Sequence, residues 1–247
     1  GLDLVRNGKA DAFVTAGNTG GAMFNALQKL GRFKGVLRPG LAGLIPVKNG
    51  HSVIIDIGAN ADCRPEFLLQ FAIMGSVYAE KVLNISNPRV GLISNGEEPG
   101  KGNQLVKETF PLLSNSGLNF IGNIEGKEFY GGEVDVAITD GFSGNVMIKA
   151  SEAVAKLITD VLKEELTSSF RTKIGALLAK PAFEQMRKLL DPSEIGAVPL
   201  LGINGLVFVG HGRSDAIAIT NAIKITQQAI NSNLLEELSN AIQKRLA

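Results

Sequence analysis

The sequence predicts an α/β fold, in which a mostly parallel, doubly wound sheet carries an antiparallel portion. Short, nearly continuous apolar runs alternate with helical patterns, as expected for strands covered on both faces. Asparagine–glycine turns join two pairs of these runs, at Lys48–Gly50 and Asn204–Gly205, which indicates antiparallel hairpins. Six glycine- and asparagine-rich turns each follow an apolar run. In open α/β sheets such turns line the crevice where ligands bind.

The first half of the chain alternates strands and helices. Pro65 suits the first turn of a helix, and Pro111 disturbs the end of another. The predicted elements are strands at Ala12–Ala16, Leu41–Val47, Ser52–Gly58 and Arg89–Ser94, and helices at Thr19–Leu30, Pro65–Leu83 and Gln104–Ser114.

The second half is dominated by helical patterns. A long helix is predicted from Asn145 to Leu166, and a further helical stretch to Leu190, interrupted at Lys180-Pro181. Asp215 caps a final helix that runs nearly to the C-terminus. The predicted strands are Leu118–Gly122, Val134–Thr139, Val198–Leu201 and Leu206–Val209. We expect one compact unit over residues 1–247.

Composition excludes several classes of protein. The chain has 247 residues, 45% of them hydrophobic and 20% charged, which is ordinary for a soluble globular protein. A net charge of +1 does not indicate nucleic-acid binding. The single cysteine, Cys63, excludes an internal disulfide and fits a reducing cytoplasm. No apolar run is long enough to cross a membrane. Residues 1–8 resemble the last turns of a helix without a start, so we expect a missing N-terminal segment.

The turn before the helix at Thr19–Leu30 is suited to an anion. The N-terminus of a helix offers free N–H groups and the positive end of its dipole. Asn18, Thr19, Gly20 and Gly21 are therefore predicted to bind phosphate, although a simple capping turn would have the same residues.

The loop at Gly96–Gly102 contains Lys101 among glycines and offers a second phosphate contact, with Asn95 and Glu97 beside it. It is not a P-loop, because its spacing differs and no Ser or Thr follows Lys101. The chain also lacks a complete G-x-G-x-x-G fingerprint, which argues against a nicotinamide cofactor. An exposed surface loop remains the alternative.

Three carboxylates and one histidine are candidates for acid–base chemistry. Asp56, Asp62 and Asp140 stand at or just past strand ends, where they could bind magnesium, orient a ligand or cap turns through the backbone. His211 lies between two glycines before a helix and is the best acid–base candidate. Cys63 has no identifiable base partner, so a packing role is favoured over a nucleophilic one.

Residues 167–190 form a predicted basic amphipathic helical hairpin. Its apolar residues include Leu177, Leu178 and Phe183, and its cations include Lys180 and Arg187. Such a hairpin can lie on an anionic membrane, dock an acidic partner or pack against a second subunit.

Taken together, several motifs resemble the phosphate acyltransferase family of bacterial phospholipid synthesis, along the whole chain and in order. They are Ala16–Gly20, Asp56–Asp62, Leu69–Glu80, Asn95–Glu98, Lys101-Gly102, Phe120–Gly126, Asp140–Asn145 and Gly202–Gly205. The family begins with a further strand–helix region that this chain lacks. The resemblance implies a fold similar to that of phosphotransacetylases and of the isocitrate and isopropylmalate dehydrogenases.

The resemblance implies an enzyme that converts an acyl–acyl-carrier-protein thioester and inorganic phosphate to acyl phosphate and free carrier protein, without cofactor or metal. It also implies a cytoplasmic homodimer, peripherally associated with the inner membrane face and the downstream glycerol-phosphate acyltransferase. Two alternatives remain: a phosphotransacetylase-like enzyme acting on acyl-coenzyme A, and a non-catalytic membrane-associated scaffold.

The expected site combines these turns. The catalytic candidates are His211, Asn204, Asp140 and Lys101. The residues expected to bind substrate or phosphate are Asn18, Thr19, Gly20, Gly21, Asp56, Asn60, Asn95, Glu97, Gly144 and Asn145. Asn60 and Asn204 are expected to stabilise the oxyanion of the tetrahedral intermediate.

Overall fold

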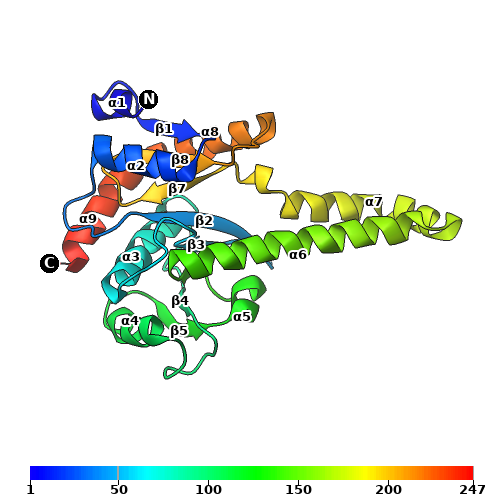
Figure 1. The fold of residues 1–247 in the computed structure, drawn as a ribbon, viewed down its shortest axis with the longest axis horizontal. Helices are drawn as coiled ribbons and strands as arrows, with labels where there is room; N and C mark the ends of the chain where they lie inside the picture. The colour runs from blue at the N-terminus through cyan, green and yellow to red at the C-terminus, as the bar shows by residue number, and fades with distance from the viewer. Residues whose placement is uncertain (49, 247) are drawn as a thin grey trace.

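The computed structural model describes residues 1–48 and 50–246 and contains one eight-stranded mixed sheet (Figure 1). The strand order is β1-β8-β7-β2-β3-β6-β4-β5. The predicted fold class is confirmed. Asn49, within the predicted Lys48–Gly50 turn, lies outside the described residues.

The helices and strands follow in chain order. They are α1 (Leu2–Arg6), β1 (Ala12–Thr15), α2 (Thr19–Leu30), β2 (Gly40–Val47), β3 (Gly50–Ile55), α3 (Pro65–Lys81), β4 (Val90–Ile93), α4 (Gln104–Ser114), β5 (Phe120–Ile124), α5 (Gly126–Gly131), β6 (Val136–Ile138), α6 (Gly141–Thr167), α7 (Phe170–Leu190), the 3-10 turn η1 (Pro192–Glu194), β7 (Ala197–Leu201), β8 (Leu206–Gly210), α8 (Ala216–Asn231) and α9 (Leu234–Leu246).

The sheet has two parallel parts, which are joined by antiparallel strand pairs. β3, β6, β4 and β5 form a parallel group, and β1 pairs in parallel with β8. The antiparallel pairs β2–β3, β2–β7 and β7–β8 lie between these groups. Both predicted hairpins are therefore present as antiparallel strand pairs.

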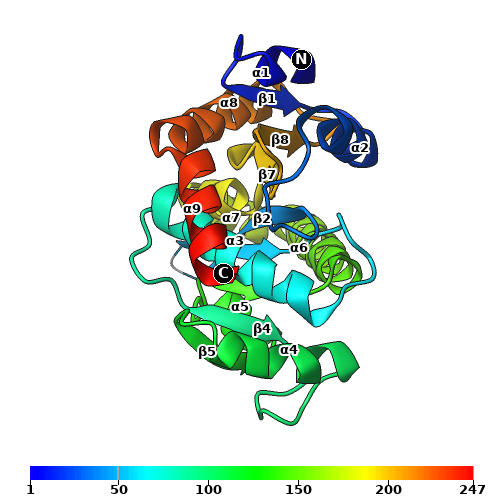
Figure 2. The ribbon, with the colours of Figure 1, turned by 90° about the vertical axis from the view of Figure 1, so that its left-hand side faces the viewer.

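Helices cover both faces of the sheet. Seen along the strands, α8 and α9 lie on one side, and α2 and α6 on the other (Figure 2). The helix α3 packs against α9, β3 and β6, and its side chains Phe71, Met74 and Tyr78 are fully buried. This helix is apolar around most of its circumference, which explains its central position in the core.

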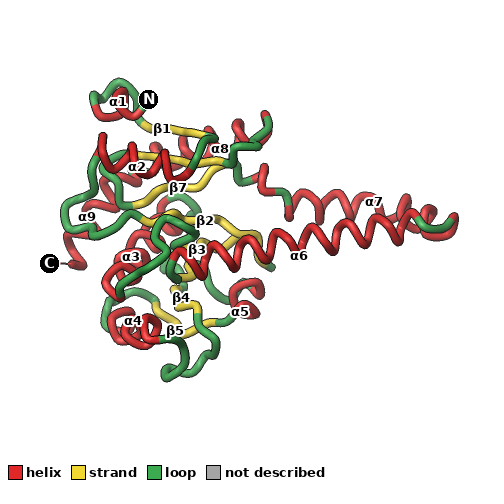
Figure 3. Tube along the Cα trace, viewed as in Figure 1, coloured by secondary structure: helices red, strands yellow, loops and turns green. Residues whose placement is uncertain are grey.

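The helices α6 and α7 form an antiparallel hairpin that projects far beyond the sheet (Figure 3). The predicted hairpin of two short helices within 167–190 is wrong in its boundaries. Residues 170–190 are one continuous helix with Pro181 inside it, and its partner is α6. Proline removes one helical hydrogen bond, but in a projecting helix water can solvate the freed Leu177 carbonyl. No helix in the described part of the chain is long and apolar enough to cross a membrane.

Three further differences from the prediction concern the helices. The C-terminal helix is divided into α8 and α9 at Asn233, which adopts a left-handed φ of 51° that asparagine tolerates. The start of α6 lies at Gly141 instead of Asn145, because Asp140 caps it. The short helix α5 was not predicted and begins with a capping box formed by Glu125 and Glu128.

Candidate active site

A cavity of about 780 Å³ lies between the two parts of the sheet. The pairing of β2 with β7 covers Gly40–Leu201 and Leu41–Leu200. Beyond these pairs, residues 43–46 of β2 and 197–198 of β7 line the cavity. Residues of α6 and of the last turns of α7 also line it.

Asp56 shapes the turn that follows β3. Its carboxylate is fully buried and accepts hydrogen bonds from the backbone N–H groups of Leu41, Gly58, Ala59 and Asn60, at 2.7–3.1 Å, and from Asn60 Nδ2 at 2.8 Å. Burial raises the pKa of Asp56, although these hydrogen bonds act in the opposite direction. With its oxygens engaged, Asp56 holds the turn in shape and does not point toward the cavity as a free base.

The first turn of α6 packs directly on this segment. The N–H of Gly141 donates to the carbonyl of Asn60 at 2.8 Å. A side chain on Gly144 would overlap the Asp56 carbonyl, so glycine is required there. This close fit places Asn145 beside Gly58, and both residues line the cavity.

Two other predicted turns meet this cavity. The β1–β8 register pairs Thr15 with Val209, so the segments after the two strands emerge side by side. Asn18 caps α2 by accepting a hydrogen bond from the N–H of Gly21 at 2.8 Å. Thr19, the first residue of α2, lines the cavity, as does His211 after β8. Gly20 follows Thr19 in the first turn of α2.

Asp140, predicted to be catalytic, is the cap of α6. Its Oδ1 accepts from the N–H of Ser143, and its Oδ2 accepts from Ser143 Oγ, both at 2.8 Å. Cys63 lies nearby and donates weakly to the Asn60 carbonyl at 3.5 Å. Burial, together with the neighbouring carboxylates of Asp56, Asp140 and Asp62, raises the pKa of Cys63 to about 12. Its thiol is therefore protonated at neutral pH, which fits the predicted packing role.

The loop after β4 does not line this cavity. Asn95 Oδ1 accepts a hydrogen bond from the N–H of Gly102 at 2.9 Å, and the stem of Lys101 packs against Gly96. The structure thus places Asn95 and Lys101 in contacts within their own loop, and neither residue is among those that line the cavity.

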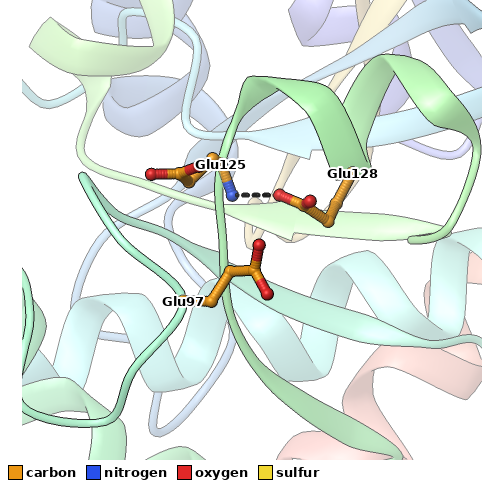
Figure 4. A group of neighbouring side chains, drawn as sticks. All are labelled: Glu97, Glu125 and Glu128. Carbon is orange, nitrogen blue, oxygen red and sulfur yellow. Dashed lines mark hydrogen bonds between the residues drawn. The ribbon is translucent and has the colours of Figure 1, made fainter.

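Glu97 belongs to a separate acidic group with Glu125 and Glu128 (Figure 4). Lys127 Nζ lies 2.5 Å from Glu97, 3.3 Å from Glu128 and 3.8 Å from Glu125. The lysine neutralises part of this charge, and Glu128 also accepts a hydrogen bond from the backbone N–H of Glu125 at 2.9 Å. These contacts hold the loop that carries Glu97 against the start of α5.

Asn204 lies at the opposite end of β8 from His211. It lines a different cavity with Phe33 and Leu206, and its backbone N–H donates to the Gly31 carbonyl at 3.0 Å. The predicted pairing of Asn204 with His211 in one site is therefore wrong. The asparagine–glycine pattern that suggested a ligand contact serves the β7–β8 turn.

Several cavity residues on α6 were not predicted from the sequence. Ile148, Lys149, Glu152 and Ala155 line it, and Lys149 Nζ pairs with Glu152 at 3.5 Å. They follow Asn145 at helical spacings of three, four, seven and ten residues. Helical periodicity counted from Asn145 would have identified this face.

Comparison with known proteins identifies the family of this chain. Residues 1–237 match a family described as "Fatty acid synthesis protein". The chain is 47% identical to the phosphate acyltransferase of Elusimicrobium minutum and 48% identical to that of Pelotomaculum thermopropionicum. Each alignment covers 97% of this chain and 70% of the relative, so the chain spans about 70% of the length of these proteins.

A solved structure supports the fold. The phosphotransacetylase from Streptococcus pyogenes superimposes with a TM-score of 0.62 at 18% sequence identity, covering 94% of this chain and 66% of that one. At this identity the likeness concerns the fold alone. The family match and the sequence identities together establish that this chain belongs to the phosphate acyltransferase family.

Proposed function

We propose that the cavity binds inorganic phosphate and the thioester of an acyl carrier protein, and that it transfers the acyl group to phosphate. The observation that carries this proposal is the meeting of three segments at one apolar cavity. Thr19 begins a helix, Asn145 lies in the first turns of another, and His211 follows a strand. An anion site beside an apolar chamber is what a phosphate-dependent acyl transfer requires.

Phosphate is proposed to bind at the start of α2. The first N–H groups of a helix lack partners within it, and Thr19 adds a hydroxyl. The helix is 12 residues long, so its dipole favours an anion at this end. The Asn18 cap holds the first turn in place without occupying the Thr19 hydroxyl.

In the proposed reaction a phosphate oxygen attacks the thioester carbonyl carbon. A C–O bond forms, the C–S bond breaks, and the electron pair leaves with sulfur. A thiol with a pKa of about 8.5 leaves readily as thiolate, so the leaving group does not require a proton. His211 is therefore proposed to assist by supplying a proton without being essential. The Asn145 amide can donate a hydrogen bond to the developing oxyanion. No covalent enzyme intermediate and no metal ion take part.

Turnover of matched substrates tests this proposal. Purified enzyme, phosphate and a chelator are mixed with an acyl–carrier-protein thioester, and acyl phosphate and free thiol are measured. Equal yields of the two products support direct transfer. Strict metal dependence, or an acylated Cys63 trapped during turnover, would contradict it.

A second candidate substrate is acyl-coenzyme A. The likeness to a phosphotransacetylase brings this carrier into consideration, but at 18% identity it concerns the fold alone and does not decide between the two carriers. Comparing kcat/KM for one acyl group on the two carriers separates them, and preference for coenzyme A would exclude our choice.

The α6–α7 hairpin is proposed to contact a membrane surface and to support a homodimer. Leu177 and Leu178 are 71% and 79% exposed, and Phe170 at the distal end is 79% exposed. Arg171 and Lys173 lie on the same distal part of α7. Exposed apolar side chains beside cations suit an anionic lipid surface. The more proximal Phe183 is partly covered, so we expect it to contribute less to this contact than Leu177 and Leu178. The exposed cations Lys180 and Arg187 lie on either side of it in the sequence.

A further inference from the structure

The cavity extends well beyond the groups that the transfer reaction needs. Along α6 its lining runs from Asn145 to Thr159, and fourteen helical rises correspond to about 20 Å. Its remaining walls are largely apolar and include Leu44 and Ile45 of β2 and Leu189 of α7. Phosphate and a thioester group would occupy only the end beside Thr19 and Asn145.

Several large apolar side chains on these walls are exposed. Ile158 is 58% exposed, Leu189 48% and Leu190 40%. Apolar surface of this kind along a cavity is typical of a site that an apolar ligand covers. The lining also contains Lys149, but that cation is paired with Glu152, so this part of the cavity offers little attraction for a second anion.

We propose that this apolar extension holds the acyl chain of the donor, with the carbonyl at Asn145 and the chain directed along α6 toward Ile158. This inference rests on the acyl transfer proposed above and assigns the chain its place. The hydrocarbon core of a bilayer is two acyl chains thick and about 30 Å deep, so one chain needs about 15 Å. The cavity length suits one such chain.

From this geometry we expect Ala155 to set the length of the acyl chain that the cavity accepts. It lines the cavity ten residues after Asn145, which is about 15 Å along the helix axis. Its small side chain leaves the distal part open. A phenylalanine at this position would fill the distal part while keeping the proximal part free.

The test compares Ala155→Phe with Ala153→Phe, which adds the same side chain at an exposed position of α6 outside the cavity lining. Each variant and the parent enzyme are assayed with short-, medium- and long-chain acyl thioesters. We expect Ala155→Phe to lower kcat/KM at least tenfold for the long chain and to leave the short chain within about twofold, where tenfold corresponds to about 1.4 kcal/mol. Ala153→Phe should keep the parent profile.

Two outcomes would overturn the proposal: an unchanged chain-length profile in a folded Ala155→Phe protein, or an equal loss for all chain lengths. A changed oligomeric state without a changed profile would assign the cavity to a subunit interface. Displacement of a fluorescent long-chain fatty acid provides a readout independent of turnover. If the parent enzyme binds this probe, Ala155→Phe weakens the binding and no thioester is converted, then the acyl site stands and the proposed reaction fails.

Discussion

Gly144 of α6 packs against the backbone carbonyl of Asp56 with no space for a side chain between them. This contact joins the first turn of α6 to the turn after β3. It also sets the position of Asn145, which is the next residue and lines the cavity. Gly144 therefore links the packing of α6 on the turn after β3 to the position of Asn145 at the cavity.

Gly144→Ala should destabilise the protein, although alanine normally stabilises a helix interior relative to glycine. Overpacking against a backbone atom is expected to lower the free energy of unfolding by about 1–3 kcal/mol. Denaturant unfolding measures this loss. Gly175→Ala on α7 is the control, since a Cβ there meets nothing within 4 Å, and it should be neutral or stabilising. Equal behaviour of the two variants would contradict the assigned contact.

The helices and strands could be predicted from the sequence, but the separation of β2 from β7 could not. The strands and the turn residues followed from local patterns, whereas Gly144 was predicted to bind substrate and its packing against the Asp56 carbonyl was not foreseen. The cavity arises where β2 and β7 diverge after Gly40 and Leu41, and no local pattern encodes such a divergence. Asp56 illustrates the second limit, because a carboxylate beside glycine has the same pattern whether it binds a ligand or, as here, backbone N–H groups.

Arg89 and Asp135 join the starts of β4 and β6. Asp135 Oδ2 accepts from the backbone N–H and Nε of Arg89 at 2.8 and 2.9 Å, and Oδ1 accepts from Nη2 at 2.9 Å. Burial opposes ionisation of Asp135, but the hydrogen bonds from Arg89 outweigh it and lower its pKa below the ordinary value of 3.8. A depressed folded-state pKa means that this stabilisation is present above pH 3.8 and is lost as the pH falls through the folded-state pKa.

Asp135→Asn should therefore lower the free energy of unfolding by about 1–2 kcal/mol at neutral pH. The expected loss is no larger because the Arg89 side chain is 43% exposed and solvent screens its interaction with Asp135. The difference from the parent protein should shrink as the pH falls below 3.8, which unfolding curves at several pH values measure. Asp160→Asn is the control. It removes an exposed ion pair with Lys156 and should cost at most about 0.5 kcal/mol. A pH-independent effect of Asp135→Asn would contradict the assigned ionisation.

Cys63 should react slowly with alkylating reagents in the folded protein. Only the thiolate is nucleophilic, and burial raises the pKa of this thiol to about 12. Alkylation at neutral pH, followed by mass spectrometry, should be much faster in denaturant than in the native state. Cys63→Ala should retain acyl transfer within about threefold. Rapid native labelling, together with loss of transfer in Cys63→Ala, would indicate a nucleophilic role instead.

His211→Gln should lower kcat by about tenfold, which lies below the usual range for general acid–base catalysis. The modest effect is expected because a thiolate is a good leaving group. Steady-state rates across pH measure it. His51→Gln is the control, since His51 lies in β3 and outside the cavity lining. A complete loss of turnover in a folded His211→Gln enzyme would mean that the histidine is essential.

The exposed part of α7 offers the last test. Leu177→Glu with Leu178→Glu places two charges where two highly exposed leucines stand. Burying such side chains in lipid is worth roughly 1.5–3 kcal/mol each, so their loss should reduce sedimentation with anionic vesicles at least tenfold. Transfer measured in solution should persist, because neither residue lines the cavity.

Ala182→Glu with Gln185→Glu is the matched control. It adds the same number of acidic side chains at exposed positions of α7 but removes no large apolar side chain. Stronger release by the leucine variant than by this control separates apolar insertion from charge repulsion, whereas equal release would indicate that charge alone governs binding.

Size-exclusion chromatography with light scattering completes the experiment. If the leucine variant still sediments with vesicles but falls apart into monomers, then the hairpin is a dimer element and the membrane contact lies elsewhere.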